Sequence, residues 1–142
     1  MAPMSNDELL ARFVFASTQA GEALMRRDGA LPPLGIAFLR EAADFQVVNP
    51  VEEDRANNLR GERLQERVNE GLCAIVGQRD DVIAVSTVLY QRGRGRIHVQ
   101  VELPEAVLQP LVFAVARVNG VWTVSDSGEP FPRLIAAPVF AR

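Results

Sequence analysis

The sequence predicts a single α+β domain in which three N-terminal helices pack on a curved, mostly antiparallel sheet. Two observations lead to this order of elements. Apolar side chains recur at helical spacing through the first seventy residues, whereas β-branched residues and glycine-bearing turns dominate after Gly71. The length of 142 residues fits one domain, and a chain of this size buries enough surface to fold without metals or disulfides.

Three helices are expected in the first half of the chain. The first should begin at the capping-box pair Ser5 and Glu8 and end at Gly29, because glycine suits a left-handed C-terminal cap. Proline is tolerated in a first helical turn, so a second helix is expected after Pro33, with apolar residues at Leu34, Phe38, Leu39 and Ala42. A third helix is expected over Leu59–Glu70, with Gly71 ending it.

The second half is expected to form strands joined by tight turns. The residues Asn119 and Gly120, between two β-rich runs, give the strongest short-range hairpin signal, and 79–81 and 92–95 are also turn-like. Consecutive hairpins imply an antiparallel meander. The expected strands are Phe45–Val48, Cys73–Gly77, Val82–Gln91, Arg96–Leu103, Leu111–Val118, Val121–Ser125 and Leu134–Phe140.

The pattern of buried faces predicts a partner for the sheet. Both faces of 82–90 and of 111–118 are almost wholly apolar, whereas an antiparallel strand with one wet face should alternate. Helices can cover only one face of such a sheet, so the other face should meet a second copy of the chain. A homodimer through the outer sheet face is therefore predicted.

The composition excludes several kinds of chemistry. The net charge is −3, and all fifteen basic residues are arginines, which disfavours general nucleic-acid binding and excludes a catalytic lysine or a P-loop. With Cys73 as the only cysteine and His98 as the only histidine, no disulfide and no Cys/His zinc site is expected, nor any cofactor. Neither a signal peptide nor a membrane span is visible, and the expected location is the cytoplasm.

Several segments together resemble the nuclear transport factor 2-like superfamily, which includes SnoaL-like cyclases and ketosteroid isomerases. The segment 26–31 resembles the turn between that family's first two helices, and 43–50 is similar to its first strand. The residues 59–61 resemble the start of its third helix, and 118–124 its late "dGkW-x-V" hairpin. The resemblance covers about residues 7–126 and implies a cystatin-like, cone-shaped α+β fold with a pocket.

The isomerase branch of that family is not matched at its catalytic positions. Asn49 stands where the family has its general base, and asparagine cannot accept a proton at neutral pH. Phe13 and Phe15 stand where the oxyanion-hole tyrosine would be, and Val112–Ala114 where its second donor would be. An isomerase mechanism is therefore not expected, and whether the chain is an enzyme stays open.

Two titratable residues are candidate catalysts. Asp44 would need burial to raise its pKa, and is otherwise an exposed residue between a helix and a strand. His98 shares a strand face with Arg96, Gln100 and Glu102, so it is either an exposed or dimer-rim histidine, or half of an acid/base pair with Asp44 or Glu102.

The resemblance implies a cone that binds a small, largely apolar molecule. Candidate ligand-binding residues are Phe13, Phe38, Phe45, Asn49, Phe113 and Trp122, and the cone would also be lined by Leu34, Leu64 and Val68. Each aromatic could equally be packing in the core, and Asn49 could simply satisfy the turn before Pro50. The alternative function is a non-catalytic interaction or assembly module whose cone is filled with side chains.

Overall fold

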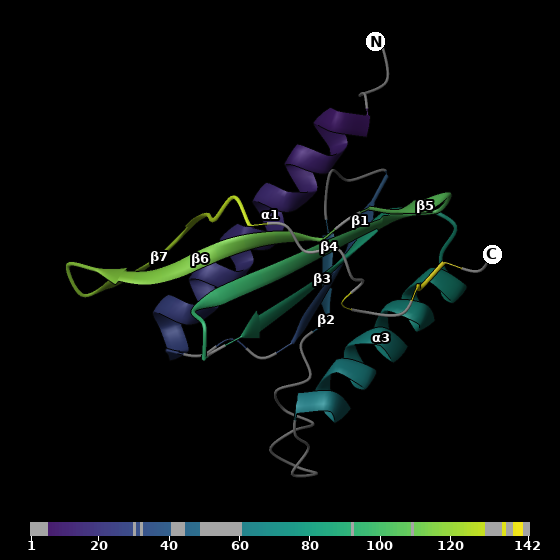
Figure 1. Cartoon of the computed structure of the whole chain (residues 1–142). Helices are drawn as coiled ribbons and strands as arrows, with labels where there is room; N and C mark the ends of the chain where they lie inside the picture. The colour runs from purple at the N-terminus through teal and green to yellow at the C-terminus, as the bar shows by residue number, and fades with distance from the viewer. Residues whose placement is uncertain are drawn as a thin grey trace.

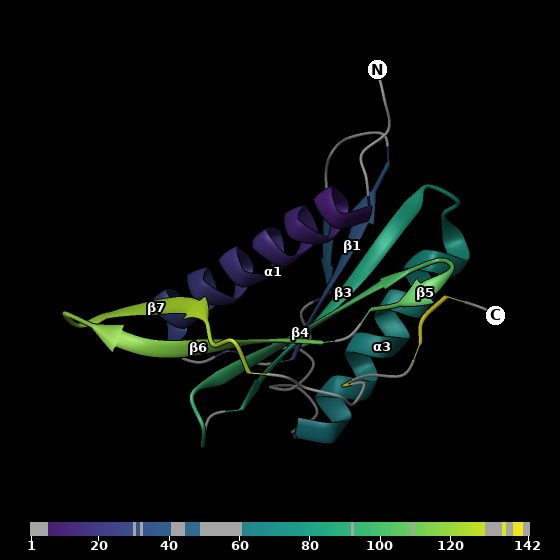
Figure 2. The ribbon, with the colours of Figure 1, turned by 45° about the horizontal axis from the view of Figure 1, so that its top comes forward.

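One curled antiparallel sheet lies between two helices, as the computed structural model shows (Figures 1 and 2). The structure describes residues 6–29, 31, 33–40, 45–48, 61–91, 93–108, 110–129, 135 and 138–140. Within these ranges the helices are α1 (Asn6–Asp28) and α3 (Gly61–Gln78). The strands are β1 (Leu34–Leu39), β2 (Phe45–Val48), β3 (Val82–Gln91), β4 (Arg96–Leu103), β5 (Ala106–Val107), β6 (Leu111–Val118) and β7 (Val121–Asp126).

The strand order is β2-β1-β3-β4-β6-β7, with the short β5 paired to β4. The predicted α+β class and the antiparallel pairing are confirmed, and β2, β3, β4 and β6 have the predicted bounds. Asn119 and Gly120 join β6 to β7 with φ angles of 52° and 79°, the conformation of a two-residue type I′ hairpin turn. Helix α1 ends as predicted at Gly29, whose φ is 65° and whose N–H donates to the carbonyl oxygen of Met25 at 2.8 Å.

The predicted second helix is wrong, because Leu34–Leu39 forms the strand β1. Five of its six residues are buried, and β1 pairs with β2 on one side and β3 on the other. A short apolar run that is buried on both faces has no polar face. Its periodicity alone therefore does not distinguish a buried strand from a buried helix. The described part of the chain therefore has two helices instead of three.

The predicted strand Cys73–Gly77 is also wrong, because these residues continue α3. The apolar residues Leu72, Ile75 and Val76 extend the stripe that begins at Val68, and all four belong to one hydrophobic cluster. Cys73 is exposed on α3. The turn at 79–81 consequently joins a helix to β3, and the described residues of 134–140 form no strand.

Gly71, expected to end the helix, lies inside it at a close contact with β2. A Cβ atom at this position would come within 2.7 Å of Cγ1 of Val48. The glycine therefore serves the packing of α3 against β2.

The helices α1 and α3 lie on opposite faces of the sheet (Figure 2), and each face carries its own hydrophobic core. On one face α1 packs through Phe13 and Met25, among others, against β1, β3 and β4. On the other face α3 packs against other residues of β1 and β3, such as Ala37 and Val85. The homodimer prediction assumed that helices cover one face only, and this assumption is wrong; the dimer itself stays a prediction.

Within the ranges described above, no helix combines the length and the apolar character needed to cross a membrane.

Candidate functional site

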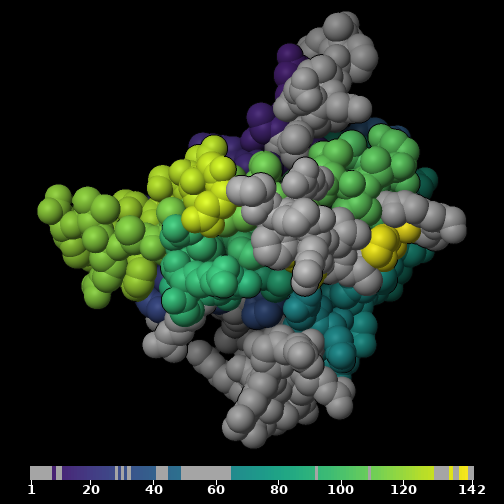
Figure 3. Space-filling model, viewed as in Figure 1, coloured from purple at the N-terminus to yellow at the C-terminus, as the bar shows by residue number. Residues whose placement is uncertain are grey.

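An open pocket of about 370 Å³ lies between the C-terminal end of α1 and the β6–β7 hairpin. This hairpin stands out from the body of the molecule at the left of Figure 3. The helix and the hairpin are brought together because α1 packs along β7. The pocket is lined by Met25, Arg26, Gly29, Arg117, Gly120, Val121 and Trp122.

Trp122 is the aromatic residue among those that line the pocket. It lies directly opposite Arg117 in the β6–β7 pairing, and the Arg117 guanidinium carbon is 5.3 Å from the centroid of the indole ring. This is the geometry of a cation–π contact, which is most favourable on tryptophan. The Arg117 side chain also donates through Nη2 to the carbonyl oxygen of Gly120 at 3.4 Å.

An ion pair on α1 holds the outer edge of β7 beside this pocket. Arg26 Nε donates to the carbonyl oxygen of Trp122 at 2.9 Å, and Glu22 Oε2 accepts from the N–H of Val124 at 3.0 Å. Arg26 Nη2 and Glu22 Oε1 are 3.2 Å apart. The two side chains thus occupy backbone groups with which a further strand would pair, which protects this edge of the sheet.

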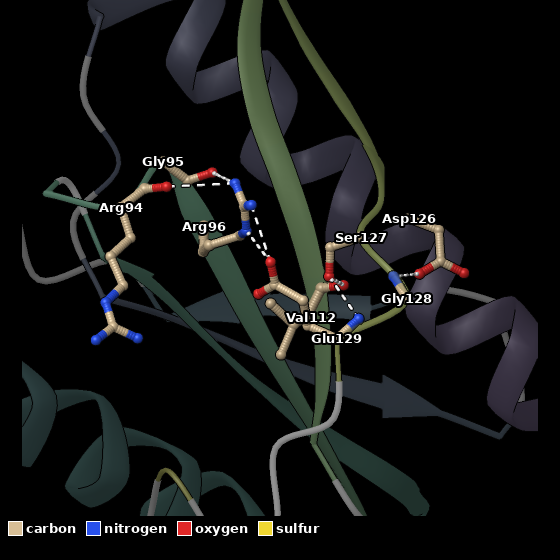
Figure 4. Close-up of polar contacts among 8 residues, drawn as sticks. All are labelled: Arg94, Gly95, Arg96, Val112, Asp126, Ser127, Gly128 and Glu129. Carbon is tan, nitrogen blue, oxygen red and sulfur yellow. Dashed lines mark hydrogen bonds and ion pairs between the residues drawn. The ribbon is translucent and has the colours of Figure 1, made fainter.

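A second polar cluster lies where β4 begins (Figure 4). Arg96 contacts Glu129 Oε1 through Nε at 3.0 Å and Nη2 at 2.9 Å. The hydrogen bond from Arg96 is the main cause that lowers the pKa of Glu129. Ser127 donates to the carbonyl oxygen of Val112 at 2.7 Å and accepts from the N–H of Glu129 at 3.1 Å. These contacts fix the turn after β7 against β4 and β6.

His98 is buried near this cluster, with only 4% of its surface exposed, so the expectation of an exposed histidine is wrong. It does share the predicted strand face with Gln100 and Glu102. Glu102 lies four residues further along β4, about 13 Å away at about 3.3 Å per residue, which is too far for a direct acid/base pair. Asp44, the other suggested partner, lies outside the described residues.

Burial lowers the pKa of His98, the charge of Glu129 opposes this shift, and Arg94 adds to it. A histidine whose folded pKa is lowered binds fewer protons in the folded than in the unfolded state. The free energy of unfolding should therefore fall as the pH drops below about 6.5, where the unfolded histidine begins to charge. Urea titrations between pH 7.5 and 5 would measure this slope.

The variant His98→Gln provides the control for that pH dependence. Because His98 is the only histidine in the chain, the variant should have a flatter profile between pH 7 and 5. A His98→Gln profile as steep as that of the wild type would show that other groups cause the slope.

The six predicted ligand-binding residues are dispersed in the structure. Phe13 and Phe38 are buried in the α1-side core with their ring centroids 4.3 Å apart, and Phe113 packs against that core. Phe45 is 47% exposed on β2, and its ring centroid is 6.4 Å from that of Phe38. Trp122 alone of these lines the pocket, and Asn49 lies outside the described residues.

The other expected cone residues also divide between the two cores. Leu34 belongs to the α1-side core, whereas Val68 lies under α3 on the opposite face. The side chain of Leu64 lies outside the described part of the chain.

The two arginines of the pocket, Arg26 and Arg117, are not among the site residues predicted from the sequence. Arg117 and Trp122 are each two positions from the Asn119-Gly120 turn, so the hairpin register could have predicted their contact. Nothing local in the sequence predicts the hydrogen bond from Arg26 to Trp122, because the two residues are 96 positions apart in the chain. No group of three or more His, Cys, Asp or Glu side chains suited to a metal ion occurs among the described residues.

No family model matches this chain, and neither a curated protein nor a solved structure matches it. The resemblance to the nuclear transport factor 2-like superfamily therefore stays a prediction.

Proposed function

We propose that this protein binds a small molecule that combines an apolar, planar body with an anionic group, in the pocket lined by Trp122. The observation that carries the proposal is the placement of Arg117 over the Trp122 ring at the wall of a pocket of about 370 Å³. Pockets that bind small molecules are typically about 300–1,000 Å³ and combine apolar walls with a few placed polar groups.

The pocket supplies both kinds of contact. Met25, Val121 and the indole of Trp122 offer apolar surface for a planar ligand. The hydrogen bond to Gly120, at 3.4 Å, uses one of the five N–H donors of the Arg117 guanidinium, which leaves donors that can bind an anion. Arg26 is held by Trp122 and Glu22, and its role is to fix the hairpin against α1.

The proposed ligand site, at the β6–β7 hairpin, differs from the site expected from the sequence, which was the interior of a cone. Phe13, Leu34 and Phe38 are 0–6% exposed and pack on one another and on neighbouring core residues. An open pocket at the hairpin is therefore better supported than a binding site beneath α1.

A second candidate function, an interaction or assembly module, is favoured by the tip of the same hairpin. Val118 and Val121 flank the turn and are 52% and 46% exposed on an arm that stands out from the body (Figure 3). Exposed apolar residues in a group often mark interaction sites. The homodimer predicted from the sequence used the outer sheet face, where α3 packs, so a dimer of this candidate would form through the hairpin tip instead. A stable monomer in sedimentation at micromolar concentration would remove the homodimer.

Ligand binding can be followed through Trp122, which is the only tryptophan in the chain. Benzoate and phenyl phosphate should change its fluorescence in a saturable way, whereas neutral benzamide should bind about tenfold or more weakly, because it makes no charge-assisted bond. The variant Arg117→Ala should weaken benzoate binding by a similar factor.

Arg67→Ala is the matched control, because Arg67 is an exposed arginine that pairs with Glu70 on α3, outside the pocket lining. It should leave benzoate binding unchanged. Equal affinity for benzamide and benzoate, or equal loss in both arginine variants, would contradict an anion site at Arg117.

A further inference from the structure

The two arginines that line the Trp122 pocket differ in their charged partners. On α1, Arg26 Nη2 lies 3.2 Å from Glu22 Oε1, so a carboxylate neutralises this guanidinium. On β6, Arg117 contacts the neutral carbonyl oxygen of Gly120 and the Trp122 ring, and no carboxylate within the described ranges is paired with it. The uncompensated positive charge at the pocket is therefore that of Arg117.

Glu22 is held in a fixed position beside the pocket. Its other oxygen, Oε2, accepts from the backbone N–H of Val124 at 3.0 Å, and only 16% of its side chain is exposed. A partly buried carboxylate is screened less by salt than a fully exposed one. Glu22 cannot turn away without losing its bond to β7, so its negative charge stays beside the Arg26 guanidinium.

The end of helix α1 adds to the negative potential at this pocket. Met25 lies in the last turn of α1 and Gly29 directly follows the helix, and both line the pocket. The C-terminal end of a helix carries a partial negative charge of about half an elementary charge. Arg27 is also in the last turn but does not line the pocket. Arg117 can therefore match one negative charge of a ligand, whereas a second would be repelled by the helix end and by Glu22.

We propose that the pocket selects planar ligands with a single negative charge, such as aromatic carboxylates, over dianions such as phosphate monoesters, and that Glu22 sets this preference. The inference rests on the proposed function, because it specifies which class of anion the Trp122 pocket takes. Glu22 does not line the pocket, so it acts through its charge and its pairing with Arg26. Replacing its carboxylate by an uncharged amide should make the pocket more tolerant of a dianion.

Three anions of similar size separate charge from shape, with the fluorescence of Trp122 as the readout. Benzoate is a planar monoanion, benzenesulfonate is a tetrahedral monoanion, and phenyl phosphate is tetrahedral with a second pKa of about 6. At about pH 8 and low ionic strength, where charges are least screened, phenyl phosphate should bind at least about threefold more weakly than benzenesulfonate. At about pH 5 phenyl phosphate is a monoanion, so this difference should disappear.

The variant Glu22→Gln removes the negative charge but keeps an oxygen that can accept from the N–H of Val124. At about pH 8 it should raise the affinity for phenyl phosphate relative to benzenesulfonate by about threefold or more. Glu70→Gln is the matched control, because Glu70 also pairs with an arginine, Arg67, but on α3 outside the pocket lining. It removes the same charge from the chain and should leave the relative affinity unchanged.

The outcomes separate this inference from the proposed function on which it rests. If none of the three anions binds more tightly than benzamide, the anion site itself is contradicted. If the anions bind but phenyl phosphate at about pH 8 binds as tightly as benzenesulfonate, the charge preference is overturned and the anion site stands. Equal effects of Glu22→Gln and Glu70→Gln would also overturn it. The comparison between the two pH values uses the wild-type chain, so it decides the question even if Glu22→Gln does not fold.

Discussion

Replacing Phe38 by alanine is expected to lower the free energy of unfolding by about 3–5 kcal/mol, the usual cost of removing a buried phenyl ring. Phe38 is 6% exposed on β1, an interior strand between β2 and β3, and its ring contacts that of Phe13 at a centroid distance of 4.3 Å. The loss leaves a cavity between α1 and the sheet that close-packed neighbours fill only in part. Urea unfolding followed by circular dichroism measures the change.

Phe15→Ala is the matched control, because Phe15 lies on α1 with 65% of its surface exposed. The same substitution there should change the free energy of unfolding by no more than about 0.5 kcal/mol. The pair of variants also decides between a filled and an open cone. A cost at Phe38 as small as that at Phe15 would indicate that the Phe38 ring borders empty space, as a ligand-lined cone requires.

The parts of the fold that were predicted correctly have strong local signals. In β4, Arg96, His98, Gln100 and Glu102 alternate with apolar residues, so its strand character and its two faces follow from a period of two. The type I′ turn at Asn119-Gly120 is specified by two adjacent residues that tolerate positive φ. Such features are determined by residues adjacent in the sequence, so they can be predicted from the sequence alone.

The errors occur where long-range packing decides between local alternatives. Leu34–Leu39 is apolar throughout, and its place between β2 and β3 makes it a strand. Ile75 and Val76 are β-branched, yet they are helical because α3 buries them against the sheet together with Val68 and Leu72. Intrinsic preference is weak beside burial of this kind.

The sites were predictable only in part for the same reason. The polar face of β4 was predicted, but the burial of Glu102 depends on Val139 and Phe140, which are 37 and 38 residues away in the chain. Arg26 reaches the pocket only because α1 packs along β7. Contacts across such distances leave no periodic trace in one sequence.

Gly35→Ala should test how closely α3 approaches the sheet, with an expected loss of about 1–3 kcal/mol in the free energy of unfolding. A Cβ atom on Gly35 would lie 2.8 Å from Cγ1 of Val68 and 3.0 Å from Cγ and Cδ1 of Leu72. Both side chains are fully buried, so neither can move aside without shifting α3.

The same change at Gly77 provides the control within the helix that Gly35 contacts. No atom lies within 4 Å of a Cβ built on Gly77, and alanine has the higher helix propensity, so this variant should gain up to about 1 kcal/mol. Equal effects of the two substitutions, measured by urea unfolding, would contradict the close packing of α3 on β1. Opposite signs are expected because one methyl group meets a filled interface and the other meets open space.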